Sequence, residues 1–215
     1  MKEFDKHIEF YKNYWWGDFS KLIPEPEWGD KKAATSYLEK YWLLQKEYED
    51  IWKPIQDNIF INQDKGLPEL IFAEQYNLLA LRGGCLFSED GFKQLQECLL
   101  VTGDAYFIVI ENTFGGKLDE PAFRLKFPTN ITWEELTSGN FVSAVVLEML
   151  HNEYFVFGGS GNWGKYSAND YKNPLDIIGF KPEYLSVFKT NFEQSSEEQE
   201  EMREWAPEKY KEHMK

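Results

Sequence analysis

The sequence contains few of the residues that build disulfide frameworks or metal centres. Its 215 residues include two cysteines and three histidines. Cys85 and Cys98 are too far apart in the sequence for a C-x-x-C redox or zinc pair, and a disulfide framework normally uses more cysteines. We therefore expect two reduced, partly buried thiols, no metal site and no cofactor.

Long hydrophobic runs and a targeting segment are also missing. No apolar stretch approaches the ~20 residues that a membrane-spanning helix needs. The first residues, MKEFDKHIEFYKNYWW, carry acids and aromatics, whereas a signal peptide has a basic flank and an apolar core. We expect a cytoplasmic protein.

Positive charge is scarce relative to negative charge. The chain has 23 Lys and Arg residues against 37 Asp and Glu residues, for a formal net charge of −14. Nucleic acids and anionic lipids bind lysine and arginine through their phosphates, so we expect neither nucleic acid nor membrane as a partner. The same field would steer a basic protein toward this one. Acidity that serves only solubility is the alternative.

The glycine-rich segment YFVFGGSGNWGKYSAND, residues 154–170, resembles three nucleotide-binding motifs and completes none. Gly159, Gly161 and Gly164 have dinucleotide-binding spacing, but the residues after them favour a strand and a turn rather than the required helix. In the phosphate-loop alignment, Tyr166 stands where Ser or Thr must bind magnesium. H-R-D and D-F-G kinase motifs are missing as well. We interpret the segment as a β-hairpin.

The histidines offer little catalytic chemistry. His151 lies between two predicted strands with Glu148 and Glu153 nearby, which would make a metal or acid–base cluster if the side chains converged. A hairpin turn explains the same residues. No G-x-S-x-G nucleophile elbow is present. We therefore assign no catalytic, cofactor-binding or metal-binding residue.

Aromatic residues are abundant, at 17% of the chain. Several tryptophans lie near a proline-containing connector, where an exposed cluster with an acidic rim would resemble an interaction hot spot. Packing of the first helix against the core is the alternative. The predicted binding surface consists of Trp16, Trp28, His151, Trp163, Tyr166 and Tyr171.

Hydrophobic periodicity predicts an α+β fold, in which N-terminal helices precede a mainly antiparallel sheet of about five strands with flanking helices. The predicted helices contain Phe4 to Trp15, the stripe from Tyr37 to Ile51 capped by Asp30, Leu67-Pro68 toward Leu81, Phe92 to Leu99, a short helix capped by Thr132, and Pro182 to Phe188. The predicted strands are Ala105–Glu111, Phe123–Phe127, Phe141–Leu150, Glu153–Phe157 and Trp163–Ser167.

Three segments follow from composition and periodicity. Residues 1–30 are an N-terminal helix and proline connector packed on the main domain, which spans residues 31–192. Residues 193–215 are an acidic C-terminal tail, mostly a solvated helix or disordered. Trp205 indicates one point where this tail docks.

Several features resemble a known superfamily. Leu67-Pro68, the predicted helix after it, Gly83-Gly84, and later Phe157–Gly161 with a strand ending at Asp170, together look like the SUKH superfamily of bacterial toxin-immunity proteins. The resemblance covers the middle of the chain and rests on helix caps and hairpin turns. It implies an α+β domain that binds and neutralises a toxin without catalysis, and it assigns no individual functional residue.

The leading hypothesis is a non-catalytic cytoplasmic binding protein, an immunity protein whose acidic surface neutralises a basic protein toxin. The alternative is a small-molecule-binding protein or enzyme with a pocket near the Gly158–Tyr171 hairpin. A third hypothesis is an accessory domain of a larger assembly. The sequence leaves the oligomeric state open.

Overall fold

A six-stranded antiparallel sheet organises the part of the chain that the structure describes. This structure is a computed structural model that describes residues 2–19, 30–112, 122–148, 153–168 and 174–214, without the side chains of residues 14–19 and 148. The strands follow the order β1-β6-β5-β4-β2-β3, and each pairs antiparallel with its neighbours. Their bounds are β1 Asn77–Arg82, β2 Tyr106–Asn112, β3 Arg124–Pro128, β4 Glu153–Gly158, β5 Trp163–Ser167 and β6 Leu175–Phe180.

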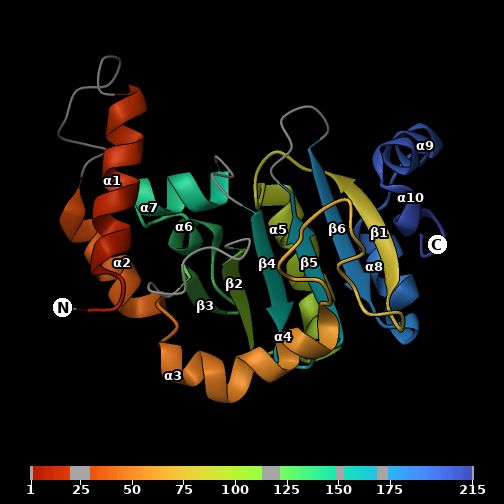
Figure 1. The fold of residues 1–215 in the computed structure, drawn as a ribbon, viewed down its shortest axis with the longest axis horizontal. Coiled ribbons are helices and arrows are strands. Elements are labelled where there is room, and N and C mark those ends of the chain that lie inside the picture. Colours follow the sequence, from red (N-terminus) through yellow and green to blue (C-terminus); the bar gives the residue numbers. More distant parts are fainter. Residues whose placement is uncertain (1, 20–29, 113–121, 149–152, 169–173, 215) are drawn as a thin grey trace.

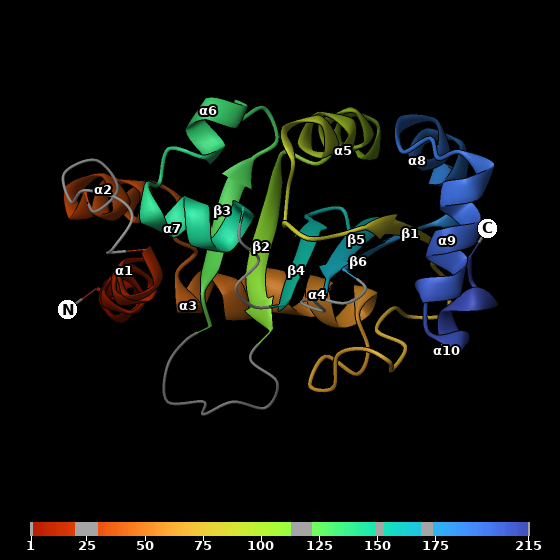
Figure 2. The same ribbon diagram turned by 90° about the horizontal axis from the view of Figure 1, so that it is seen from above.

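Helices cover both faces and both edges of this sheet (Figures 1 and 2). In Figure 2, α5, α6 and α8 lie on one face and α3 and α4 on the other, while α1 and α2 flank β3 and α9 and α10 flank β1. The α-helices are α1 Asp5–Phe19, α2 Lys31–Tyr41, α3 Gln45–Glu47, α4 Lys53–Ile59, α5 Glu89–Thr102, α6 Trp133–Leu136, α7 Phe141–Ser143, α8 Leu185–Asn191, α9 Ser196–Trp205 and α10 Glu208–Lys211. The π-helical turns are η1 Tyr48–Trp52 and η2 Ala144–Glu148, and η3 Pro182–Tyr184 is a 3-10 helix.

The sheet separates two hydrophobic cores, because successive side chains of a strand point to opposite faces. The core under α5 contains Phe107, Val156 and Trp163. The core on the other face contains Phe155 and Tyr166. Adjacent residues of β4 and β5 therefore belong to different cores, and the sheet is buried on both sides.

Both edges of the sheet are covered by other segments of the chain. Beside β3, Trp42 forms an isolated bridge with Leu125. Beside β1, Leu78 donates its amide to the His213 carbonyl, and Gln194 donates its side-chain amide to the Ala80 carbonyl. Covering the edges removes unpaired backbone groups that would otherwise template aggregation.

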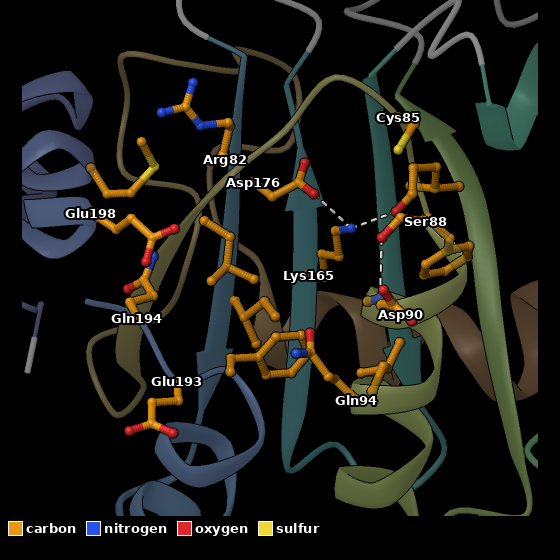
Figure 3. Close-up of a pocket in the computed structure, with 18 of the residues that line it drawn as sticks. Arg82, Cys85, Ser88, Asp90, Gln94, Lys165, Asp176, Glu193, Gln194 and Glu198 are labelled. Carbon is orange, nitrogen blue, oxygen red and sulfur yellow. Dashed lines mark hydrogen bonds and ion pairs between the residues drawn. The ribbon is translucent and has the colours of Figure 1, made fainter.

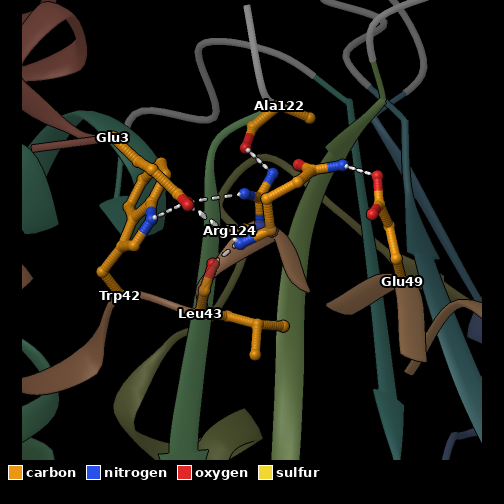
Figure 4. Close-up of polar contacts among 7 residues, drawn as sticks. Glu3, Trp42, Leu43, Glu49, Ala122 and Arg124 are labelled. Atoms are coloured by element: carbon orange, nitrogen blue, oxygen red, sulfur yellow. Dashed lines mark hydrogen bonds and ion pairs between the residues drawn. The ribbon is translucent and has the colours of Figure 1, made fainter. Parts of the chain in front are cut away.

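A buried arginine fixes the N-terminal segment against the β3 edge (Figure 4). Arg124 is 1% exposed in its side chain and donates to the Leu43 carbonyl at 2.7 Å and to Glu3 Oε2 at 3.0 Å. Glu3 also accepts hydrogen bonds from Trp42 Nε1 and from the Gln45 amide, each at 3.0 Å. The carboxylate thus joins three elements that are distant in the sequence.

Many predicted elements are confirmed, beginning with the α+β class and the antiparallel sheet. The Thr132 capping box is present, with Glu135 N donating to Thr132 Oγ1 at 3.1 Å. The predicted helix through Phe92 is α5, which ends at Gly103 with φ 74°. The hairpin of β4 and β5 surrounds the glycine-rich turn.

The predicted helix from Leu67-Pro68 toward Leu81 is wrong, because residues 67–76 form no helix and Asn77–Arg82 is strand β1. Leu78 and Ala80 face one core while Leu79 faces the other. A strand buried on both faces lacks the alternation of polar and apolar residues, so its apolar run looks like part of a helix. For the same reason β6 was not expected, although all six of its residues are buried.

The predicted strand Phe141–Leu150 is also wrong for its first eight residues, which form α7 and η2. Residues 149–150 lie outside the described residues. All side chains from Phe141 to Leu147 are buried, so the run shows no helical amphipathicity. Asn140 begins the helix, because its side-chain oxygen accepts the Phe141 amide at 2.9 Å.

The stripe from Tyr37 to Ile51 does not form one continuous helix. Asp30 caps α2 as predicted, with its carboxylate accepting the amides of Lys32 and Ala33. However, α2 ends at Tyr41, because the backbone becomes extended at Trp42 to reach β3. Helical structure restarts at Gln45.

The C-terminal segment from residue 193 to 214 is helical, as one of the two alternatives predicted, and it docks more firmly than expected. Met202, Ala206 and Tyr210 are buried in the core that also contains Phe155 and Tyr166. Trp205, the predicted docking point, packs under the Arg82 guanidinium at 5.0 Å. The helices α9 and α10 therefore form the wall of the molecule beside β1.

Candidate functional site

A row of polar residues crosses the sheet on the face that α5 covers. The strand register pairs Glu111 with Tyr154, Tyr154 with Ser167, and Ser167 with Asp176. Directly paired residues of antiparallel strands point to the same face. Tyr154, Ser167 and Asp176 are all buried. Polar groups of this kind are uncommon in a core and indicate a site with a purpose beyond packing.

Lys165 and Asp176 form a buried ion pair at one end of this row. Lys165 Nζ lies 2.7 Å from Asp176 Oδ2, and the two side chains are 9% and 6% exposed. The ammonium also donates to the Leu86 carbonyl and lies 5.1 Å from the centre of the Phe87 ring. Three neighbours therefore hold Lys165 in one orientation.

The second oxygen of Asp176 is left without a partner. Asp176 Oδ1 and the Ser167 hydroxyl are both buried, and neither meets hydrogen-bond geometry with any group of the described chain. Burial raises the pKa of Asp176, although the charge of Lys165 and the nearby Ser167 hydroxyl oppose the rise. A buried carboxylate oxygen without a donor is costly for a folded protein.

The ion pair lines a cavity of about 260 Å³. Strands β1, β5 and β6 form its floor, the start of α5 forms one wall, and the residues from Phe192 through α9 form the other (Figure 3). Figure 3 shows Lys165 between Asp176 and the first turn of α5, with Glu193, Gln194 and Glu198 on the opposite wall.

Acidic residues dominate the rim of this cavity. Four carboxylates lie on the rim, against one guanidinium, while Asp176 and Lys165 lie at the floor. That guanidinium, Arg82, is already paired with Glu201 and stacked on Trp205. We call the cavity and this rim the acidic cleft. Its rim carboxylates are Asp90, Glu193, Glu198 and Glu201.

The first turn of α5 already carries negative charge, so it is a poor place for an anion to bind. Ser88 caps the helix, accepting the Gly91 amide on its hydroxyl oxygen at 3.1 Å. Glu89 and Asp90 place negative charge in the first turn, where it compensates the helix dipole. The cleft is therefore electrostatically suited to a cation.

A second cavity of about 460 Å³ adjoins the cleft between β1, α8 and α9. It is larger, but Lys189 and Arg203 offset the carboxylates along its walls. None of its lining residues is a buried charged side chain. We place the candidate site in the smaller cavity, because the buried ion pair of Lys165 and Asp176 lines it.

The glycine-rich hairpin, whose glycine spacing resembles nucleotide-binding motifs, packs its turn against a buried aspartate. Asp104 accepts hydrogen bonds from the Ser160 amide at 2.6 Å, the Thr102 hydroxyl at 2.6 Å and Trp163 Nε1 at 2.9 Å. A Cβ on Gly158 would lie 2.4 Å from Asp104 Cγ. Gly158 thus lets the hairpin approach Asp104, and the segment after it enters β5 rather than a helix.

The residues of the predicted binding surface do not meet in one described place. Trp163 and Tyr166 are fully buried, on opposite faces of β5, so neither reaches the surface. Trp28, His151 and Tyr171 lie outside the described residues, as does the side chain of Trp16. The cluster suggested for His151, Glu148 and Glu153 falls outside them too, since the first two side chains are not described.

Sequence reasoning missed Asp176 altogether and met Lys165 only as part of an incomplete phosphate-loop match. The sequence does contain a signal for this ion pair, because Lys165 and Asp176 each place a charge within a strand of mostly apolar residues. The segment Leu175–Phe180 reads LDIIGF, and Lys165 lies between Gly164 and Tyr166. Charged residues are rarely buried unless they are paired, so two such strands predict a buried ion pair.

The described residues contain no group of three or more His, Cys, Asp or Glu side chains arranged to hold a metal ion. Within them, no helix combines the length and apolar character needed to cross a membrane. Cys85 is half-buried at the cleft and Cys98 is buried. No protein-family model, curated protein or solved structure matches the chain.

Proposed function

We propose that this protein is a non-catalytic binding protein whose acidic cleft receives a basic group of its partner. The observation that carries the proposal is a cavity with an acidic rim, with the buried pair of Lys165 and Asp176 at its floor. The four rim carboxylates outnumber the one guanidinium beside them, so the opening favours a cation.

The charge of the whole molecule supports the same partner chemistry. The net charge of −14 would attract a basic protein over a distance set by the ionic strength. At the cleft, Asp90 and Glu193 are exposed and form no ion pair within the described chain, so they can face an incoming cation. Association should therefore be fast at low salt and slow at high salt.

The specific form of the proposal is an immunity protein that neutralises a basic protein toxin in the cytoplasm. The resemblance to the SUKH superfamily supports this form, as does the lack of a complete catalytic motif in the sequence. A sequence with only two cysteines is compatible with a reducing compartment. Nucleic acid and membranes are not proposed as partners, because an acidic surface repels phosphates.

Co-expression with the product of the neighbouring gene tests this form. We expect the neighbour to arrest growth, this protein to relieve the arrest, and the purified complex to dissociate as salt rises. The double substitution Asp90→Asn and Glu193→Gln should weaken protection. Its control, Glu74→Gln with Glu134→Gln, removes the same charge from exposed residues away from the cleft and should protect normally.

Two results would count against an immunity function. One is a neighbour that is not toxic, and the other is toxicity that this protein leaves unchanged. Equal weakening by the cleft and control substitutions would show that net charge, rather than the cleft, drives binding.

A small-molecule-binding protein is the second candidate, and the cavity itself favours it. Lys165 belongs to the hairpin near which a pocket was predicted, and it lines a cavity of about 260 Å³. This volume is slightly below the ~300–1,000 Å³ typical of drug-sized ligands. A ligand of amino-acid size would fit.

A further inference from the structure

We infer that the acidic cleft receives an apolar side chain flanked by Lys or Arg residues, on an exposed segment of the basic protein partner. This inference rests on the proposed function and names the chemistry of the segment that docks. Three features of the cleft support it: a floor whose charges are paired with each other, an apolar lining, and carboxylates on two facing walls.

The floor of the cleft offers no place for a charge of the partner. Lys165 Nζ lies 2.7 Å from Asp176 Oδ2 and also donates to the Leu86 carbonyl. The two charged side chains are only 9% and 6% exposed. A cation that entered the cavity would approach this ammonium, and an anion would have to pass the acidic rim. An uncharged group can enter without either repulsion.

Apolar side chains line the cavity between its floor and its rim. Leu81 of β1 and Cys85 are half-buried, so both present surface to the cavity. Phe192, at the start of the opposite wall, is 7% exposed. The cavity measures about 260 Å³, which leaves room for one large apolar side chain but not for a drug-sized ligand or a second segment. Docking of such a side chain would remove apolar surface of both molecules from water.

Carboxylates lie on both sides of the cavity opening. Asp90 belongs to the first turn of α5, and Glu193 lies on the opposite wall, just before α9 (Figure 3). Both residues are exposed, and neither forms an ion pair within the described chain. Arg82, the guanidinium at the rim, is paired with Glu201. Positive residues on either side of the inserted side chain would therefore each face a carboxylate.

The cavity supplies the affinity that an acidic rim lacks. Exposed ion pairs contribute little to binding, because water and salt screen them. At protein interfaces, a side chain anchored in a pocket contributes most of the binding energy, whereas rim charges raise the association rate and select the partner. The cleft contains both features, so it fits a basic segment with one apolar anchor better than a segment that is basic throughout.

Titration of the isotope-labelled protein with three peptides, followed by NMR, tests the inference. The peptides, acetylated and amidated at their ends, are KKLKK, KKGKK without the anchor, and EELEE with the opposite charge. We expect KKLKK to bind at least about tenfold tighter than KKGKK, because burial of a leucine side chain contributes at least that factor. EELEE should not bind. The largest shifts with KKLKK should appear at Leu81, Cys85 and Gln94.

The substitution Gln94→Trp tests the cavity without changing the charge of the rim. Gln94 is exposed on α5 and lines the cavity, so an indole there would occupy part of the volume that the anchor needs. We expect the affinity for KKLKK to fall about tenfold, to that of KKGKK. Gln75→Trp is the matched control, since Gln75 is exposed and lines neither cavity, and it should bind KKLKK normally. Circular dichroism checks the fold of both variants.

The outcomes separate the inference from the proposed function. Tighter binding of KKLKK that is lost in Gln94→Trp and kept in Gln75→Trp supports the inference. No binding of KKLKK, equal binding of KKGKK, shifts away from the cleft, or unchanged binding by Gln94→Trp overturns it. If it is overturned while Asp90→Asn with Glu193→Gln still weakens the partner complex, the proposed function stands alone. If KKLKK binds as expected but the neighbouring gene product forms no complex, the inference stands and the immunity proposal falls.

Discussion

At the scale of single residues, the two buried ion pairs differ in how completely their charged groups are hydrogen-bonded. Arg124 has all its partners, because Glu3, Leu43 and Ala122 accept its hydrogen bonds. The pair of Lys165 and Asp176 leaves an oxygen free. A fully paired ion serves to hold the fold, whereas Asp176 Oδ1 is buried beside the Ser167 hydroxyl without a hydrogen bond of good geometry.

The Glu3 and Arg124 pair gives a prediction on pH. Burial alone would raise the pKa of Glu3, but hydrogen bonds from Trp42 and Gln45 and the charge of Arg124 outweigh it and lower the pKa below 4.5. An acid whose folded pKa is lowered stabilises the protein above its unfolded pKa, and this contribution is lost as pH falls through the folded pKa.

We expect Glu3→Gln to lower the free energy of unfolding at pH 7 by about 1–2 kcal/mol, near the lower end for a charged hydrogen bond because Glu3 is 34% exposed. Urea unfolding at pH 7 and pH 3 measures it, with exposed Glu134→Gln as control. The difference from wild type should shrink at pH 3. A difference that stays constant with pH would mean that packing, not charge, is lost.

At the scale of elements, the hairpin of β4 and β5 depends on the close approach of its turn to Asp104. Gly158 makes this approach possible, since its absent Cβ would lie 2.4 Å from Asp104 Cγ. Gly159 differs, because a Cβ there would meet Trp52 at an ordinary distance of 3.5 Å. The position of Gly158 therefore has no room for a Cβ, whereas the position of Gly159 has.

Substitution of the two glycines measures this difference. We expect Gly158→Ala to cost about 1–3 kcal/mol of stability, because the backbone must shift and the hydrogen bonds to Asp104 weaken. Gly159→Ala is the matched control and should change stability by less than about 0.5 kcal/mol. Urea unfolding followed by tryptophan fluorescence gives both values. If both substitutions lower the stability equally, the close approach of Gly158 to Asp104 does not determine the stability of the hairpin.

At the scale of the whole molecule, the charge imbalance acts against compactness. A net charge of −14 produces self-repulsion that salt screens. The exposed ion pairs, such as Lys46 with Asp50 and Lys53 with Asp57, contribute little to stability individually. Screening of this repulsion should therefore determine how the stability of the fold changes with salt.

We expect the midpoint of thermal unfolding to rise by about 2–4 °C between 10 and 200 mM sodium chloride, which corresponds to about 1 kcal/mol for a chain of this length. Calorimetry at constant pH measures the midpoint, and potassium chloride should give the same curve because screening does not depend on the identity of the cation. A midpoint that falls with salt would mean that specific ion pairs outweigh the general repulsion.

Local patterns in the sequence were sufficient for elements whose signals lie within a few residues. The capping box at Thr132, the amphipathic α5 with its Gly103 terminus, and the glycine turn between β4 and β5 were all predicted. The stability of these elements depends on residues that are close in the sequence, through caps, turns and the periodicity of buried side chains. The acidic charge and the α+β class were also available from the sequence.

Only the tertiary structure decided the elements that are buried on every side and the site that they form. Asn77–Arg82 and Phe141–Glu148 are both apolar runs, yet one became β1 and the other a helical segment. Their partners, β6 for the first and α1 for the second, are distant in the sequence. The acidic cleft arose in the same way, because strand register placed Lys165 beside Asp176, and the docking of α9 supplied one wall of the cavity.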